Sequence, residues 1–329
     1  MNILITGGTG FIGKQLANQL LRMPNFSFEG EETKSIDKLT LFDAFPGDHK
    51  WTDPRVELVV GDIGDRGAVE RLTNDVDIVW HLAAVVSSDA EANFDLGMRV
   101  NLTGMLNLLE TLRAKGSRPR LVNASSFAVF GGDLPEVVTD RTDLTPKTSY
   151  GTQKAVGELL VGDYTRKGFI DGRSLRLPTI TVRPGKPNKA ASTFVSSIIR
   201  EPLARQATVC PVERETLVYI SSPRRAVDAM IRAMYLSDKT IGAERTIPLP
   251  GLTLSVGEMI DALERVAGPM ATKLIRWEPD PTIQRIVKGW PGRVEAARAK
   301  ALGFNADRNF DEIVRAHIED QAVSRWWEQ

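Results

Sequence analysis

The sequence has little cysteine and histidine, and this scarcity restricts the kinds of site the chain can carry. Its single cysteine, Cys210, cannot form a disulfide within the chain, and a cysteine-rich metal site is excluded. The three histidines, His49, His81 and His317, lie far apart and lack the spacing of metal ligands. We therefore expect no metal site.

The chain also lacks an excess of charge and a long apolar run. Lysine and arginine total 42, as do aspartate and glutamate, which argues against a nucleic-acid or anionic-membrane partner. No apolar stretch approaches the roughly 20 residues that a membrane-spanning helix needs. The N-terminal apolar run, residues 3–5, is too short for a signal peptide. We expect a soluble, cytoplasmic protein.

The first fifteen residues contain a short apolar run followed by three glycines spaced three apart. Residues 3–5 predict a buried parallel strand, after which Gly7 permits a sharp turn. Gly10 would let the backbone approach a pyrophosphate, and Gly13 would let the next helix pack closely. Phosphates are favoured at such a helix N-terminus, whereas a purely structural strand–turn–helix is the alternative. The expected dinucleotide contacts at this turn are Gly7, Gly10, Phe11, Ile12 and Gly13.

Asp43 ends the expected second strand, residues 39–43, and is the candidate for selecting NAD over NADP. An acid here can accept hydrogen bonds from both hydroxyls of the adenosine ribose and would repel a 2′-phosphate. The polar segment 24–38, which we expect to be a surface insertion, places Asp43 later than the usual spacing of about 20 residues. A turn aspartate is therefore the alternative, but the sequence favours NAD.

Strands alternate with helices through the first half of the chain, which predicts an α/β fold with a Rossmann-type, doubly wound parallel sheet. Further strands are expected at 56–60, 76–82, 120–126 and 174–177, and long helices at 93–115 and 150–166. Beyond residue 178 prolines interrupt the pattern, and we expect helices near 193–200, 224–236, 255–266, 281–288 and 293–301. We predict an NAD-binding domain over residues 1–178 and a smaller mixed α/β substrate-binding lobe over 179–329. Segments around 217–250 should return to the first domain.

Several residues at strand ends are further candidates for cofactor contacts. Asp62 and Ile63 follow the third strand, where an adenine edge would lie. The small side chains of Ala83 and Ala84 would allow backbone to run beside a cofactor, whereas His81 is interpreted as structural. The remaining expected cofactor contacts are Leu82, Tyr150, Lys154, Leu177 and Thr179.

Tyr150 and Lys154 are one helical turn apart, on the same face of an expected helix. A tyrosine that acts as a base near pH 7 needs its pKa lowered by roughly 3 units, or about 4 kcal/mol. A nearby lysine ammonium favours the phenolate. Ser126, at the end of the fifth strand, could hold the substrate oxygen beside Tyr150, and Ser125 competes for that role.

Together these residues resemble the extended branch of the short-chain dehydrogenase/reductase superfamily. The resemblance covers the glycine turn, Asp62-Ile63, residues 82–84, residues 101–104, residues 126–131 and the Tyr150/Lys154 pair. It implies that Ser126 is the catalytic serine and that Asn101 holds a helix bend and a water molecule of the lysine. Dehydratases of this branch carry an Asp-Glu pair directly after the serine, where this chain has Phe127-Ala128. Dehydration is therefore not expected.

The second half of the chain resembles the D-erythronate dehydrogenases, a group within this branch. The segments that carry the resemblance are 135–140, 172–179, 182–188, 199–203 and 222–227. It implies NAD-dependent oxidation of a four-carbon sugar acid, D-erythronate, at C2 to 2-oxo-tetronate. The alternatives are a nucleotide-sugar epimerase with tightly bound NAD and a non-catalytic NAD sensor.

A sugar-acid substrate requires a partner for its carboxylate, and the loop after residue 182 offers several. Arg183 is the first choice because its planar guanidinium can bind a carboxylate through two hydrogen bonds, although a solvated basic loop is the alternative. Other expected substrate contacts are Ser87, Asn188 and Ser192, with Lys186 and Lys189 as competing cations. The family resemblance also implies a homodimer formed through the helices at 93–115 and 150–166.

Overall fold

The computed structural model describes residues 1–29, 32–185 and 191–328. The chain divides into two compact units. The first unit comprises residues 1–129, 146–176 and 227–248, and the second comprises residues 130–145, 177–226 and 249–329. The units differ from the predicted domains in two places: the segment 130–145 groups with the second unit, and of the region 217–250 only residues 227–248 return to the first.

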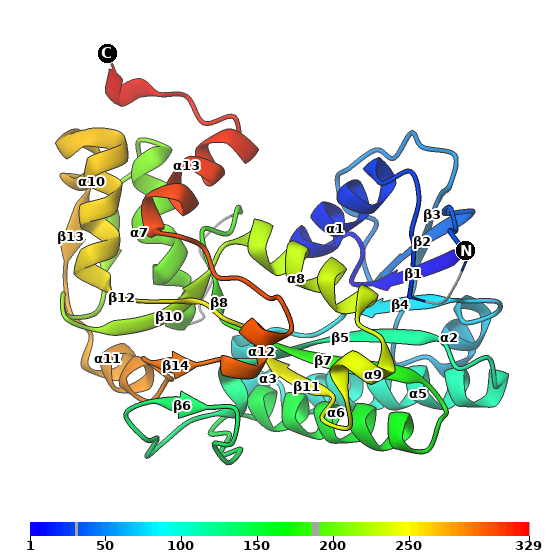
Figure 1. Ribbon diagram of the computed structural model, residues 1–329. Helices are drawn as coiled ribbons and strands as arrows, with labels where there is room; N and C mark the ends of the chain where they lie inside the picture. The colour runs from blue at the N-terminus through cyan, green and yellow to red at the C-terminus, as the bar shows by residue number, and fades with distance from the viewer. Residues whose placement is uncertain (30–31, 186–190, 329) are drawn as a thin grey trace. The chain divides into compact units, whose positions relative to one another are not determined.

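The first unit is built on a seven-stranded parallel sheet, which confirms the Rossmann-type fold class (Figure 1). The strand order is β11-β7-β5-β4-β1-β2-β3, so the chain order reverses between β1 and β4, where ligands bind in open α/β sheets. The strands are β1 (Asn2–Thr6), β2 (Lys38–Asp43), β3 (Val56–Val60), β4 (Ile78–His81), β5 (Arg120–Ser126), β7 (Asp171–Leu177) and β11 (Thr246–Pro248).

Helices cover both faces of this sheet. In Figure 1, α1 (Phe11–Arg22) and α8 (Pro223–Tyr235) lie on one face, and α5 (Gly104–Lys115) and α6 (Ser149–Arg166) lie on the other. The core on the α5 and α6 side includes Leu4, Leu108 and Val161, all inaccessible to solvent. The other helices of this unit are α2 (Arg66–Leu72), α3 (Ser87–Ala92), α4 (Phe94–Gly97) and α9 (Asp238–Ile241).

Two expectations for the first unit need correction. The helix expected over 93–115 is interrupted, because η1 (Met98–Thr103) is π-helical and separates α4 from α5. The segment 24–38 is not simply a surface insertion, because Phe26 and Ile36 are buried and Phe26 pairs with Lys34 in an antiparallel bridge. Among its described residues the apolar Phe26, Phe28 and Ile36 are buried, whereas the polar side chains are exposed.

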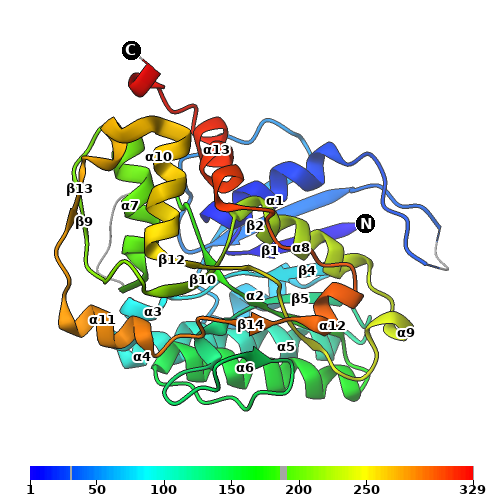
Figure 2. The ribbon, with the colours of Figure 1, turned by 60° about the vertical axis from the view of Figure 1, so that its left-hand side comes forward.

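The second unit contains small sheets with helices packed around them (Figure 2). Its strands are β8 (Thr179–Ile180), β10 (Leu217–Ser221) and β12 (Leu252–Ser255) in one sheet, β9 (Thr208–Cys210) with β13 (Ile275–Trp277), and β6 (Val138–Thr139) with β14 (Val294–Glu295). Its longer helices are α7 (Phe194–Leu203), α10 (Val256–Thr272), α11 (Pro281–Lys288) and α13 (Phe310–Asp320). None of the helices among the described residues has the length and apolarity that a membrane crossing requires.

The helix predictions for the second unit were wrong in two places. The helix expected at 293–301 is only α12 (Ala297–Ala301), because Val294 and Glu295 pair with β6. Helix α13 was not expected, although Phe310, Ile313 and Val314 have helical spacing and are buried. The Asn309 side chain accepts a hydrogen bond from the Glu312 N–H at 2.9 Å, which is an N-cap signal that could have located this helix.

Candidate active site

The glycine turn lies at the carboxyl end of β1, directly beside the end of β4. Gly7 has a φ of +72°, and a Cβ there would lie 2.8 Å from the backbone N of Ala83. A Cβ on Gly13 would overlap the carbonyl oxygen of Gly7 and lie 2.8 Å from the Cα of Gly8. Side chains at Gly7 and Gly13 would therefore collide with backbone, so both positions need glycine for steric reasons.

The start of α1 fits the pyrophosphate of a dinucleotide. Gly10 is the N-cap residue and provides no side-chain hydrogen bond to the helix, so the free N–H groups of the first turn can bind an anion. A Cβ on Gly10 would meet only the carbonyl oxygen of Gly7, at 3.1 Å. The side of the turn that a phosphate would approach is therefore open, and the residues present fit a dinucleotide.

Asp43 lies beside this turn. Its carboxylate accepts hydrogen bonds from the backbone N–H of Thr9 at 3.2 Å and of Phe45 at 3.4 Å. The first contact links Asp43 to the glycine turn, whereas the second closes the turn after β2. The first contact is compatible with a role of Asp43 in the cofactor site, and the second with a turn aspartate.

The other predicted cofactor residues differ in how accessible they are. Asp62 accepts the Gly64 N–H at 2.8 Å and forms an ion pair with Arg99. Ile63 is buried and packs against Gly104, where a Cβ would lie 2.7 Å from the Ile63 side chain. Residues 82–84 are half-buried at the end of β4, Leu177 ends β7, and Thr179 begins β8 in the second unit.

Tyr150 and Lys154 lie in the first two turns of α6. The helix begins at this point because the Thr148 side chain accepts the Gly151 N–H at 3.0 Å. The Lys154 Nζ lies 5.6 Å from the centre of the Tyr150 ring and donates to the carbonyl oxygen of Ala124 at 2.8 Å. Burial lowers the pKa of Lys154 to about 8, and the charge of Glu158 opposes this lowering.

Ser126 is brought towards α6 by the close approach of the helix to the turn after β5. A Cβ on Gly151 would lie 2.9 Å from the carbonyl carbon of Ala128, so the first turn of α6 packs directly on that turn. The half-buried Ser126 accepts the Ala128 N–H at 3.1 Å through its Oγ. Adjacent residues of a strand point to opposite faces, and the buried Ser125 instead donates to Glu158 at 2.5 Å. The geometry therefore favours Ser126 over Ser125.

Asn101 joins three elements beside these residues. It lies in η1, is buried, and accepts the Val85 N–H at 2.8 Å. Its Nδ2 donates to the Gln153 side chain at 2.7 Å, next to Lys154 in the sequence. Asn101 thus links the π-helical turn to α6 and to the loop after β4.

His81 and Glu158 are buried titratable groups near Lys154. The Nδ1 of His81 lies 2.8 Å from the Thr6 hydroxyl, and burial, followed by the charge of Lys154, lowers the His81 pKa to about 3. His81 is therefore neutral, in line with a structural role. Glu158 was not among the predicted site residues, yet its carboxylate pairs with Arg176 at 2.7 Å. Its position one helical turn after Lys154 was the available signal.

The predicted substrate residues are distributed between the two units. Ser87 begins α3 in the first unit, whereas Arg183 and Ser192 belong to the second. The Arg183 backbone is fixed, because its N–H donates to Ser196 at 3.1 Å and its carbonyl accepts from Arg200 at 2.7 Å. Asn188, like Lys186 and Lys189, lies outside the described residues.

Comparisons with known proteins identify the family of the chain. The D-erythronate dehydrogenase of Cupriavidus necator is 49% identical over 99% of this chain and 100% of that protein. The D-erythronate dehydrogenase of Haemophilus influenzae is 43% identical over 97% of this chain and 99% of that protein. The crystal structure of a nucleoside-diphosphate-sugar epimerase from Agrobacterium tumefaciens matches with a TM-score of 0.93 and 43% identity, covering 99% of this chain and 96% of that one. Since the model of the NAD dependent epimerase/dehydratase family also matches residues 3–235, the chain belongs to that family.

Proposed function

We propose that the chain is an NAD-dependent dehydrogenase that oxidises D-erythronate at C2 to 2-dehydro-D-erythronate. The observation that carries this proposal is the identity of 49% and 43% with two D-erythronate dehydrogenases over nearly the whole chain. The grouping of Ser126, Tyr150 and Lys154 in the first unit supports it, because these side chains can hold and deprotonate an alcohol.

Tyr150 would accept the proton of the C2 hydroxyl while the Ser126 hydroxyl holds the same oxygen. Lys154 supports this step electrostatically, because a pKa of about 8 leaves it mostly protonated near pH 7 and its positive charge favours the Tyr150 phenolate. Asn101 acts as a positioning residue, since its amide bonds fix the start of α6 against the loop after β4.

The glycine turn and Asp43 would hold NAD, with the pyrophosphate at the start of α1 and the adenosine ribose at the Asp43 carboxylate. When bound, NAD supplies the hydride acceptor. Asp62, Ile63, residues 82–84, Leu177 and Thr179 remain proposed cofactor contacts. Ser87, Arg183, Asn188 and Ser192 remain proposed substrate contacts.

A nucleotide-sugar epimerase is the second candidate, because the 43% identical structure from Agrobacterium tumefaciens is described as one. The two activities use NAD differently. An epimerase retains its NAD through two hydride transfers and needs none added, whereas a dehydrogenase releases NADH. Purified protein incubated with a UDP-sugar, or with D-erythronate and added NAD, separates the two.

The test is NADH formation from D-erythronate, measured by absorbance for the wild type and for Tyr150→Phe. We expect the variant to lose at least 10²-fold in kcat, because only the proton acceptor is removed. Tyr164→Phe is a matched control on the same helix, since the Tyr164 hydroxyl donates to Glu110 and takes no part in the proposed chemistry. Turnover of a UDP-sugar without added NAD, or undiminished activity of Tyr150→Phe, would contradict the proposal.

We also propose that the protein forms a homodimer through α5 and α6. Leu159 on α6 is 67% exposed, and a second copy related by a twofold axis would cover it with the same surface. Light scattering should give twice the mass of one chain. A monomeric wild type at micromolar concentration would refute the dimer. A Leu159→Lys variant that is as dimeric as the wild type would refute this interface.

A further inference from the structure

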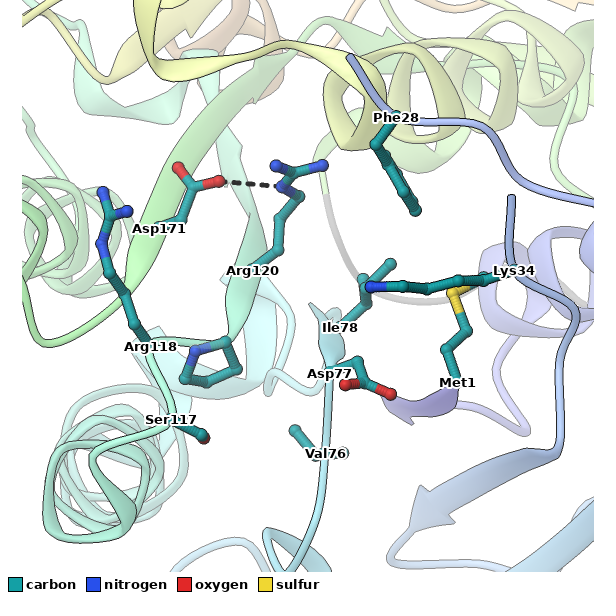
Figure 3. Close-up of a pocket in the computed structure, with 11 residues that line it drawn as sticks. Met1, Phe28, Lys34, Val76, Asp77, Ile78, Ser117, Arg118, Arg120 and Asp171 are labelled. Carbon is teal, nitrogen blue, oxygen red and sulfur yellow. Dashed lines mark hydrogen bonds and ion pairs between the residues drawn. The ribbon is translucent and has the colours of Figure 1, made fainter. Parts of the chain in front are cut away.

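A cavity of about 280 Å³ lies in the first unit, at the amino ends of the sheet strands (Figure 3). Its lining includes Arg120, which begins β5, and Asp171, which begins β7. The glycine turn follows the carboxyl end of β1, so the cavity and the proposed NAD site lie at opposite ends of the sheet strands. Nothing in the proposed catalytic reaction uses this cavity.

Arg120 and Asp171, which line the cavity, belong to an arginine network centred on Asp171. The Asp171 carboxylate accepts hydrogen bonds from Arg120 at 2.8 Å, Arg173 at 2.6 Å and Arg245 at 3.2 Å. Arg120 lies in β5, Arg173 lies in β7 and Arg245 directly precedes β11, so the neighbouring positions of these strands in the sheet bring the three arginines together. A single carboxylate therefore faces three guanidinium groups.

The network includes a second carboxylate, but its positive charges still outnumber its negative charges. Asp238 accepts from Arg245 at 2.8 Å and from Arg118 at 2.6 Å. Four arginines thus share two carboxylates, which leaves an excess of two positive charges. The opposite charges of Lys34 and Asp77, which also line the cavity, leave this balance unchanged.

Arg173 shows that the network is short of acceptors. The residue is fully buried, and among the described residues its Nε and Nη1 have no hydrogen-bond partner. Burial, together with the charges of Arg120 and Arg245, lowers the pKa of Arg173 to about 10, although Asp171 opposes the shift. Burying an incompletely paired cation is costly, and an anion in the adjoining cavity would reduce that cost.

Within the described part of the chain, three cationic side chains line the cavity: Lys34, Arg118 and Arg120. In Figure 3 the side chains of Arg118 and Arg120 lie on one side and those of Lys34 and Phe28 on the other. The Arg118 side chain is 48% exposed, which connects the network to solvent. Its backbone has a φ of +52°, an uncommon conformation for a residue other than glycine.

We propose that this cavity binds the phosphate group of a small anionic ligand, either a phosphate monoester or inorganic phosphate. A phosphate monoester carries a charge of about −1.5 to −2 near pH 7, which matches the excess of two positive charges. Arginine forks suit phosphate oxygens, and a cavity of this size admits only a small molecule. Asp77 would accept hydrogen bonds from hydroxyl groups of an ester.

The test is calorimetric titration of the NAD-saturated protein with glycerol 2-phosphate and with inorganic phosphate, against sodium chloride at equal ionic strength. Saturation with NAD prevents phosphate from binding at the glycine turn. We expect Arg118→Gln to weaken binding at least 10-fold. Arg66→Gln is the matched control, since Arg66 pairs with Glu70 on α2 and does not line the cavity.

Loss of binding in Arg118→Gln with retention in Arg66→Gln supports the proposal, and the tighter of the two ligands identifies the source of the phosphate group. Absence of binding to the NAD-saturated wild type overturns it, as does unchanged binding by Arg118→Gln. If circular dichroism shows that Arg118→Gln is unfolded, Lys34→Met replaces it under the same criteria. The titration does not depend on dehydrogenase activity, so the two proposals can fail separately.

Discussion

Replacing Glu158 by glutamine should destabilise the first unit strongly. Glu158 is 3% exposed and Arg176 is 7% exposed, and the carboxylate accepts hydrogen bonds from Arg176 at 2.7 to 3.1 Å. Ser125 donates to the same carboxylate at 2.5 Å. In Glu158→Gln the Arg176 guanidinium would remain charged and buried after the negative charge of Glu158 is removed.

Removing one partner of a buried ion pair costs about 3–5 kcal/mol. In a unit of this size each kcal/mol corresponds to roughly 2–4 °C in melting temperature. We therefore expect Glu158→Gln to melt about 6 to 20 °C below the wild type. Thermal unfolding followed by circular dichroism measures this difference.

Three controls separate the ion pair from other effects. Ser125→Ala removes one charged hydrogen bond but keeps the pair, so it should cost less, about 1.5–3 kcal/mol. Glu70→Gln breaks the exposed pair with Arg66 and should change the melting temperature little. The double variant Glu158→Leu/Arg176→Met should recover much of the loss, because it removes both charges of the buried pair.

A drop of less than 2 °C in Glu158→Gln would refute this reasoning, since it would mean that water solvates Arg176 as well as Glu158 does. A double variant as unstable as the single one would instead show that packing, and not charge, accounts for the loss.

Three further predictions concern the proposed site. Asp43→Asn should weaken NAD binding and relax discrimination against NADP, and an unchanged preference in cofactor titrations would make Asp43 only a turn residue. Burial lowers the pKa of Lys154 to about 8, below its unfolded value near 10.4, so the unfolded state binds more protons between these pH values. The Lys154 contribution to stability therefore becomes more favourable as pH rises from about 8 to about 10, and urea unfolding of the apo protein should show a smaller rise for Lys154→Met than for the wild type. Arg183→Met should raise KM for the acid by one to two orders of magnitude, on the order of 1.5–3 kcal/mol, with NAD affinity unchanged. Equal losses for a neutral alcohol analogue would show that Arg183 does not bind the carboxylate.

The local sequence was sufficient for the elements whose signals lie within one turn or strand. The glycine spacing at residues 7–13 reflects close contacts of the turn with its own helix and with the end of β4. The residue types alone therefore indicate the turn. The pairing of Tyr150 with Lys154 follows from the helical repeat. The alternation of strands and helices similarly predicted the parallel sheet.

Other features depend on which distant segments pair. Val294 and Glu295 form a strand only because β6 lies beside them, which no local pattern reveals. The choice between Ser125 and Ser126 depends on Glu158, which lies on a different element and binds the Ser125 hydroxyl.

The sequence by itself determined the glycine turn, the strand and helix periods and the Tyr150/Lys154 pair, because these follow from steric and helical repeats along the chain. Only the tertiary structure placed Asp171 against Arg120, Arg173 and Arg245 and Glu158 against Arg176. Such charge networks depend on strand register and burial. Burial sets how much the loss of one partner of an ion pair costs, and it is a property of the folded chain.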